Sequence, residues 1–326
     1  NTQKVLAEGE DALFLTVQSI QKGGIVAVKG LGGFHLLCDA TNSQAVEKLR
    51  ERKNRPLKPF AVMFRDIETL NASVQISVEE TKLIASKEKP IVIVPKRLPS
   101  SISDAVAPKI DRLGVFLAYT PLHYLLLDLL NVPLVATSAN MSDEPIIRNG
   151  AMLIKKLGSV VDSVLDHDRE IINTNDDSVV QMADDKMITL RLARGYAPKS
   201  ITLPFKSKKK ILAVGANQKN SIELIFDNTL ILSPHIGDLN SLEAFEYFER
   251  TVETFKRFYD FEPDLIVHDK HPEYMTTQWS KGYKDENPEV ETIEVQHHYA
   301  HILSGLAEFN IEDKVLGFAF DGTGYG

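Results

Sequence analysis

The stretch Gly23-Gly24-Ile25-Val26-Ala27-Val28-Lys29-Gly30-Leu31-Gly32-Gly33-Phe34-His35 decides the fold of the first part of the sequence. Its apolar run from Ile25 to Val28 follows two glycines and predicts a short buried strand. The glycines after this run would let a ligand approach the backbone closely, but they would equally suit an ordinary turn. The stretch therefore indicates a strand that ends in a glycine turn.

The residues that follow predict a mixed α/β domain, because short apolar runs alternate with stretches of helical spacing. The expected strands cover residues 36–38, 60–64, 91–94, 115–119 and 134–137. The expected helices cover residues 43–52 and 122–130. Residues 178–192 predict a hairpin that turns at Asp184-Asp185.

A break in composition separates a second part. Residues 198–210 contain two prolines and a run of lysines without regular periodicity, and we interpret them as a linker with the domain boundary between 206 and 207. Beyond it we expect strands at 211–214, 221–226, 230–233, 265–268, 292–295 and 315–320. We expect a hairpin turn at Asp227-Asn228-Thr229 and helices at 241–259, 273–283 and 298–309, the first of them with Leu242 and Phe248 on its apolar face.

This order of elements resembles one lobe of the ribonuclease-H-like fold of actin/hexokinase-type ATPases. Residues 315–320 then resemble the first strand of a second lobe. The fold class predicted for the whole chain is α/β, a mixed α/β domain followed by a ribonuclease-H-like lobe. The sequence stops at Gly326 and lacks an initiator Met, so we expect a truncated piece of a longer protein.

The bulk composition excludes several classes of protein. Of the 326 residues, 43% are hydrophobic and 25% charged, which is typical of a soluble globular protein. The net charge of −8 argues against a general nucleic-acid binder. No stretch reaches the roughly 20 apolar residues of a membrane helix. The single cysteine, Cys38, excludes an intrachain disulfide, fits a reducing cytoplasm and is expected to be a small buried residue.

Two polar clusters of the first part could bind a ligand. Arg50, Arg52, Lys53, Arg55 and Lys58 form a basic stretch stiffened by prolines, which suits a triphosphate but equally a solvated helix end. The second cluster, Thr137-Ser138-Ala139-Asn140, follows an apolar run and could grip phosphate or a small polar substrate. Serine and asparagine are also common in caps and turns, so the residue types alone leave both readings open.

The end of the chain suggests a metal site. His297 and His301 are four residues apart, which places both imidazoles on one face of a helix. Asp321 is the nearest oxygen ligand, although an aspartate before glycine also makes turns. The glycines of Asp321-Gly322-Thr323-Gly324-Tyr325-Gly326 could admit a phosphate.

The order of these motifs resembles a known family. The run Gly23–Gly30, then Lys53-x-Arg55, then Ser138-x-Asn140 resembles the YrdC family, which makes carbamoyl adenylates from ATP. In that family the matching motifs bind the nucleotide and carbamoyl groups. The resemblance therefore implies these roles for Lys53, Arg55, Ser138 and Asn140, which we expect to be the catalytic residues.

Further motifs resemble one branch, the HypF family of hydrogenase-maturation carbamoyltransferases. In the first part they are Gly30–Leu36, Thr120-Pro121-Leu122-His123, Asp176-Asp177-Ser178-Val179 and Arg194-Gly195-Tyr196-Ala197-Pro198. In the second part they are 212–216, 233–239, 268–274 and the terminal segment, which resemble the TsaD-like domain of that family. The resemblance implies a YrdC-like domain over 1–206 and an incomplete TsaD-like lobe over 207–326.

The resemblance also implies cofactors. ATP is expected, with Mg²⁺ on its phosphates. The residues expected to contact the nucleotide are Lys29, Lys58, Thr137, Arg194, Gly322 and Gly324. A divalent metal, iron or zinc, is expected at His297, His301 and Asp321, with weak or no occupancy in a truncated lobe.

The implied reaction activates carbamate derived from carbamoyl phosphate and transfers the carbamoyl group to the C-terminal cysteine of a partner, HypE. The family's acylphosphatase domain, zinc-finger region and remaining lobe are not in this sequence, so we do not expect the piece to complete the reaction unaided. Two alternatives are an enzyme that makes threonylcarbamoyl-adenosine in tRNA and a YrdC-like RNA-binding module. The HypF-specific motifs and the acidic charge count against the first alternative, and the basic concave face of YrdC-like domains is the reason for considering the second.

Overall fold

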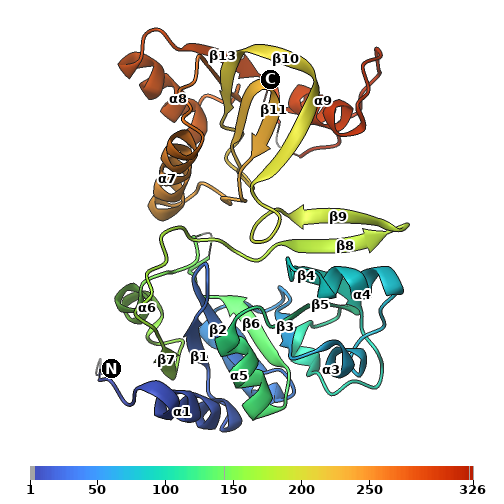
Figure 1. Cartoon of the computed structure of the whole chain (residues 1–326), viewed down its shortest axis with the longest axis vertical. Helices are drawn as coiled ribbons and strands as arrows, with labels where there is room; N and C mark the ends of the chain where they lie inside the picture. Colours follow the sequence, from blue (N-terminus) through green and yellow to red (C-terminus); the bar gives the residue numbers. More distant parts are fainter. Residues whose placement is uncertain (1–3, 143, 323, 326) are drawn as a thin grey trace. The chain divides into compact units, whose positions relative to one another are not determined.

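The computed structural model describes residues 4–142, 144–322 and 324–325. The chain divides into two compact units, one formed by residues 4–142 and 146–196 and the other by 144–145 and the described residues from 197 onward (Figure 1). The boundary between the two units lies between Tyr196 and Ala197, whereas the sequence analysis set it between 206 and 207. Every helix in the described part of the chain is too short or too polar to cross a membrane.

A single mixed sheet organises the first unit (Figure 1). Among the described residues, its order is β7-β1-β2-β6-β3-β5-β4-β8-β9. The strands are β1 (Val26–Lys29), β2 (Phe34–Asp39), β3 (Ala61–Phe64), β4 (Ile91–Pro95), β5 (Arg112–Leu117), β6 (Leu134–Ser138), β7 (Ser163–Leu165), β8 (Val179–Ala183) and β9 (Lys186–Arg191). The predicted hairpin is confirmed, because Asp184 and Asp185 join β8 to β9 with φ of 47° and 61°, as a tight two-residue turn requires.

Helices cover both faces of this sheet. They are α1 (Gly9–Gln21), α2 (Ser43–Arg52), α3 (Ile67–Asn71), α4 (Val78–Ala85), α5 (Pro121–Leu130) and α6 (Gly150–Leu157). The predicted helix over 43–52 is confirmed, with Asn42 as the cap that accepts from the amide of Ala45. Thr120 caps α5 in the same way, with Pro121 at its first position.

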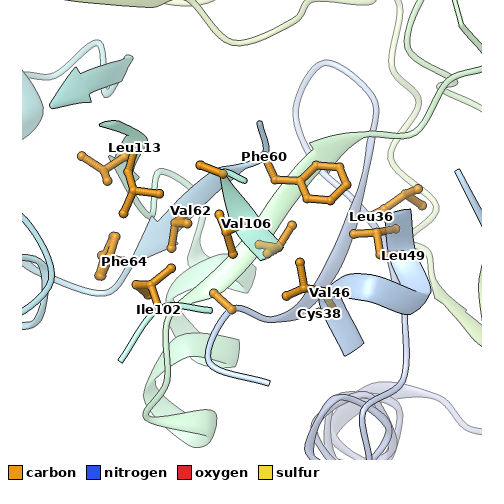
Figure 2. Close-up of a cluster of buried hydrophobic side chains, with 14 of the residues drawn as sticks. Leu36, Cys38, Val46, Leu49, Phe60, Val62, Phe64, Ile102, Val106 and Leu113 are labelled. Atoms are coloured by element: carbon orange, nitrogen blue, oxygen red, sulfur yellow. The ribbon is translucent and has the colours of Figure 1, made fainter. Parts of the chain in front are cut away.

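The core of the first unit lies on the face that α2 covers (Figure 2). Residues of α2, β2, β3 and β5 and Phe60, just before β3, meet there, and among them are Leu36, Cys38, Val46, Leu49, Val62, Phe64 and Leu113. Cys38 is buried as expected, and burial raises the pKa of its thiol to about 12, so it stays protonated and unreactive at neutral pH. A second cluster joins α1 and α5 to the opposite face.

The second unit has a sheet of order β11-β10-β12-β13. Its elements are β10 (Lys199–Ala213), β11 (Glu223–Leu232), α7 (Leu242–Phe258), β12 (Leu265–Asp269), α8 (Met275–Glu286), β13 (Glu291–Val295) and α9 (His297–Phe309). β12 runs parallel to both β10 and β13, so their carboxyl ends share one edge of the sheet. The order of the sequence analysis is recovered from α7 to α9, but its first three strands are two in the structure, β10 and β11.

Three sequence predictions for this unit are wrong. The lysine run is not a linker, since it lies within β10, where Lys206 pairs with Asp227 across the ladder at 3.2 Å. The turn at 227–229 does not form, because β11 runs straight through it and Asp227, with φ of 51°, marks an irregularity in the pairing with β10. Leu242 is exposed at the start of α7, while Phe248 is buried as expected.

The strand expected at 315–320 is also absent from the described residues. Residues 314–320 adopt no regular structure, and Leu316, Phe318 and Phe320 are exposed. A strand needs a neighbour to take its backbone hydrogen bonds, and the ladder of the second sheet ends at β13 in the described part of the chain.

Candidate functional site

The side chain of Lys53 brings together the two motifs that the sequence analysis singled out. Lys53 ends α2, and its ammonium donates to the carbonyl of Ser138 at 2.7 Å, the carbonyl of Asn140 at 3.1 Å and the Oδ1 atom of Asn140 at 3.0 Å. Ser138 ends β6, and its hydroxyl donates to the same Oδ1 at 2.9 Å. Three of the four predicted catalytic residues therefore form one hydrogen-bonded group.

The ammonium of Lys53 sits in a partly dehydrated and positive environment. Burial lowers its pKa to about 8, with further lowering by the charges of Arg55 and Lys58 and an opposing effect of Asp176. An ammonium of this kind gains stability when an anion comes close, because the anion compensates for lost hydration. The electrostatics of the group therefore favour an anionic ligand.

Arg55, the fourth predicted catalytic residue, belongs to a loop that is tightly organised. Its guanidinium donates to the carbonyls of Lys58 at 3.2 Å and Pro59 at 2.7 Å and lies 5.2 Å from the ring centroid of Phe60. Burial, followed by the charges of Arg50 and Arg191, lowers the pKa of Arg55 to about 10. The guanidinium keeps its charge at neutral pH in a fixed position.

Arg50 fixes the conformation of this loop. It is buried, donates to the carbonyls of Arg55 at 2.7 Å and Val106 at 2.9 Å, and lies over the ring of Phe60. Of the basic cluster, Arg50 thus has a structural role. Lys58 is exposed at the end of the loop and supplies its carbonyl to both Arg50 and Arg55.

The glycine turn after β1 packs against a later segment of the chain. Asn175 donates its amide to the carbonyl of Gly32 at 3.1 Å, and a Cβ placed on Gly32 would lie 2.1 Å from the carbonyl oxygen of Asn175. No side chain fits at Gly32 while the segment after Asn175 stays in place. This contact connects the turn to Asp176, whose charge acts on Lys53.

Other residues predicted to contact the nucleotide occupy distinct positions. Thr137 is buried in β6, next to Ser138. Lys29 is buried, donates to the carbonyl of His167 at 2.8 Å and forms an ion pair with Asp166 at 3.0 Å. The ammonium of Lys29 therefore bonds to His167 and Asp166 and not to the group around Lys53.

Arg194 lies in a buried polar cluster that sequence reasoning missed. Its guanidinium donates to Asp177 at 2.8 Å and lies 3.6 Å from the ring centroid of Tyr119, while His35 Nε2 lies 3.3 Å from the other oxygen of Asp177. His123 contacts both His35 and Tyr119. We call His35, Tyr119, His123, Asp177 and Arg194 the buried polar cluster. The signal for it in the sequence was that His35, His123, Asp177 and Arg194 stand in motifs quoted for the family resemblance, whereas Tyr119 stands in none of them.

The charges within this cluster are well defined. Burial alone would raise the pKa of Asp177, but its hydrogen bond to His35 and the charge of Arg194 hold that pKa well below its usual range. Burial raises the pKa of Tyr119 well above its usual value and lowers that of His123 to about 3. At neutral pH Asp177 is therefore ionised, and Tyr119 and His123 are neutral.

The second unit brings the predicted metal ligands together. His297 Nε2 lies 2.8 Å from Oδ2 of Asp321, and His301 Nε2 lies 3.3 Å from the same oxygen. Donor atoms of the three residues all lie within 4.8 Å of one another. Two imidazoles and a carboxylate converging in this way suit a divalent transition metal.

A fourth residue, Asp269, supports this group. It is buried at the end of β12, and its Oδ2 lies 2.7 Å from Nδ1 of His297. A carboxylate on the far nitrogen of a ligating imidazole is typical of metal sites, because it fixes the ring and its tautomer. Sequence reasoning quoted Asp269 only within a longer motif and assigned it no role.

The glycines of the terminal segment show no phosphate cradle of their own. A Cβ on Gly322 would meet nothing within 4 Å, and a Cβ on Gly324 would lie 2.2 Å from the ring of His298. Thr323 and Gly326 of the same motif lie outside the described residues. The role of Gly322 and Gly324 in phosphate binding stays a prediction.

Two family models match the chain. Residues 18–193 match the Sua5/YciO/YrdC model, described as telomere recombination, which covers more than half of the chain. Residues 206–308 match the model of the HypF Kae1-like domain. The two matches fall in the order that the sequence motifs indicated.

Individual proteins agree with these models. A protein named carbamoyltransferase HypF from Synechocystis sp. is 45% identical over 324 residues, which are 99% of this chain and 42% of that protein. A full-length HypF crystallised with phosphate and nucleotide is 41% identical with a TM-score of 0.90, over 97% of this chain and 49% of that one. HypF of T. kodakarensis is 38% identical with a TM-score of 0.92, over 98% of this chain and 42% of that one.

The chain thus spans less than half the length of the relatives named above. Nearly the whole of this chain aligns with these relatives, in sequence as well as in fold. The chain belongs to the HypF family, in which a Sua5/YciO/YrdC-type unit is followed by a HypF Kae1-like unit.

Proposed function

We propose that the first unit forms carbamoyl adenylate from ATP and carbamate. A carbamate oxygen attacks the α-phosphorus of ATP, the bond to the β-phosphate breaks, and pyrophosphate leaves with the electron pair. The observation that carries the proposal is the hydrogen-bonded group of Lys53, Ser138 and Asn140 beside the basic loop. The relative crystallised with phosphate and nucleotide agrees with a nucleotide in this family.

The residues of the group suit this chemistry. Lys53 and Arg55 supply fixed positive charge for the triphosphate and for the charge that develops as pyrophosphate leaves, which is a purely electrostatic task. Ser138 and Asn140 offer hydroxyl and amide groups that orient the reactants. Mg²⁺ on the phosphates would reduce their mutual repulsion.

The second unit would consume the adenylate by carbamoyl transfer. A thiolate of a partner protein, in this family the C-terminal cysteine of HypE, attacks the carbamoyl carbon, and AMP leaves. His297, His301 and Asp321 would hold a divalent metal, iron or zinc, which would supply positive charge for phosphate or carbonyl oxygens. Asp269 orients the ring of His297 for this purpose. We place the whole reaction in [NiFe]-hydrogenase maturation, in the cytoplasm.

Exchange of labelled pyrophosphate into ATP tests the first step. The chain is incubated with ATP, Mg²⁺ and freshly dissolved ammonium carbamate, which supplies carbamate directly. We expect carbamate-dependent exchange that falls at least about a hundredfold in Lys53→Ala. Lys87→Ala serves as the matched control, because Lys87 is exposed on the same unit.

Two results would contradict the proposal. One is the absence of carbamate-dependent exchange in a chain that binds ATP. The other is exchange in Lys53→Ala and Arg55→Ala at the parental rate. Tight, salt-sensitive binding of tRNA in a filter assay would instead support the tRNA-directed enzyme or the RNA-binding module.

A further inference from the structure

His35 lies on the same face of the sheet as Ser138, beside the group around Lys53. The two strands are antiparallel neighbours, and the register places His35 at the start of β2 directly opposite Ser138 at the end of β6. Side chains of directly opposed residues stand side by side on one face. Because Ser138 and Asn140 bind Lys53, this register puts a buried imidazole at the edge of the candidate adenylate site.

The tautomer of His35 follows from its partner. Asp177 is ionised and can only accept, so His35 donates from Nε2 across the 3.3 Å contact. In this tautomer of the ring Nδ1 carries the lone pair. This nitrogen lies close to the glycine turn, since a Cβ on Gly30 would lie 3.5 Å from it. The ring therefore presents a hydrogen-bond acceptor beside the turn.

The rest of the buried polar cluster holds this acceptor in place. Arg194 neutralises Asp177 and is itself fixed by the carbonyls of Glu88 and Lys89, at 2.9 and 2.8 Å. Tyr119 lies under the guanidinium, and His123 closes the cluster at 5.8 Å from His35, centroid to centroid. Both ring nitrogens of His123 are buried without a hydrogen-bond partner among the described residues.

Such an arrangement is costly unless it serves a purpose. Buried polar groups and charges destabilise a fold relative to apolar side chains of the same size, even when they are paired. In this unit the buried polar groups lie together near the end of β6, next to Ser138. The core on the other face of the sheet is apolar. A ligand bound beside Ser138, which His35 faces across the two strands, would explain the cluster.

We propose that His35 is a substrate-contacting residue that accepts a hydrogen bond from the amino group of carbamate, and that Asp177 is its positioning residue. The proposal rests on the proposed function of the first unit. Phosphate oxygens are acceptors and repel a second acceptor, so we expect the phosphates of the nucleotide to contact Lys53 and Arg55 and not Nδ1 of His35. At the reacting end of the substrates, the amino group of carbamate is the donor that Nδ1 can use. His35 would thus favour carbamate over carboxylates without an amino group, such as acetate.

Two substitutions of His35 separate its two nitrogens. His35→Gln keeps a donor close to the Nε2 position but places no acceptor where Nδ1 lies, whereas His35→Asn places its Oδ1 close to the Nδ1 position. We expect the Gln variant to raise the KM for ammonium carbamate in pyrophosphate exchange by about tenfold, the factor of one lost hydrogen bond. The Asn variant is expected to stay within about threefold of the parent. Asp177→Asn should raise the same KM, since it no longer fixes the ring.

The dissociation constant for ATP, measured by calorimetry without carbamate, is the second readout. In both His35 variants it should stay within about twofold of the parent value, which also shows that the unit is folded. A parental KM in the Gln variant would overturn the proposal, and so would equal losses of ATP affinity and carbamate-dependent exchange. A parent chain that exchanges no label contradicts the proposed function itself, and this result is visible before any variant is made.

Discussion

The Nδ1 atom of His297 lies 2.7 Å from the buried carboxylate of Asp269, while Nε2 of the same ring lies 2.8 Å from Asp321. The first contact arises from the sheet, because Asp269 ends β12 and pairs in register with Val295, two residues before His297. One nitrogen is thus fixed by the core of the unit, and the other is directed at the predicted metal ligands. The imidazole is oriented before any metal binds.

Removing the charge of Asp269 should therefore weaken metal binding without removing a ligand. We expect Asp269→Asn to bind Zn²⁺ about 10–100-fold more weakly in calorimetric titrations, the range typical of such supporting carboxylates. Asp285→Asn is the matched control, because Asp285 is exposed on α8. Equal affinities in the two variants would assign Asp269 a role in folding alone.

Asp269 also shows how far the sequence could go. The strand before it was predicted, and parallel strands bring their carboxyl ends to one edge, so an acidic residue at that position could have been proposed as a partner of His297. The partner strand and its register, however, are set by tertiary packing. The pair at 2.7 Å could not be read from spacing along the chain.

Two aspartate-containing segments show the same limit of sequence reasoning for the fold. Asp184 and Asp185 reverse the chain between β8 and β9, as predicted, whereas Asp227 has a similar positive φ inside the continuous strand β11. Local turn chemistry is the same for a hairpin and for a ladder irregularity. Only the long partner strand β10, which was interpreted as a linker, distinguishes them.

The lowered pKa of Lys53 predicts how ATP affinity depends on pH. With a pKa of about 8, the ammonium is mostly charged at pH 7 and mostly neutral at pH 9. If the charged form binds the triphosphate, affinity falls by up to about tenfold between these values, and binding near pH 8 takes up protons. Calorimetry in buffers of different ionisation enthalpy measures both effects. Lys53→Arg should remove most of the pH dependence, and the same slope in that variant would exclude Lys53 as its source.

Gly32 should tolerate no side chain. Its Cβ would lie 2.1 Å from the backbone oxygen of Asn175, so Gly32→Ala must displace the segment that carries Asp176 and Asp177. We expect a loss of about 1–3 kcal/mol in the free energy of unfolding and a fall in pyrophosphate exchange. Gly282→Ala, in α8 with open space around it, is the control and should be neutral or stabilise by up to about 1 kcal/mol. If Gly32→Ala kept the parental free energy of unfolding and the parental rate of pyrophosphate exchange, this contact would not be what holds the segment.

Arg50 should matter for the shape of the basic loop rather than for its charge. Its fork of donors reaches the carbonyls of Arg55, Lys58 and Val106, which a lysine cannot satisfy together. Arg50→Lys keeps the charge but leaves buried carbonyls without donors, so we expect about 2–3 kcal/mol less stability in urea unfolding and weaker ATP binding. In Arg52→Lys, which alters a partly exposed ion pair with Asp162 and one hydrogen bond to the carbonyl of Val160, the change should stay below about 1 kcal/mol. If Arg50→Lys lost stability but kept parental ATP affinity, the geometry of the loop would not be what positions Arg55 for the nucleotide.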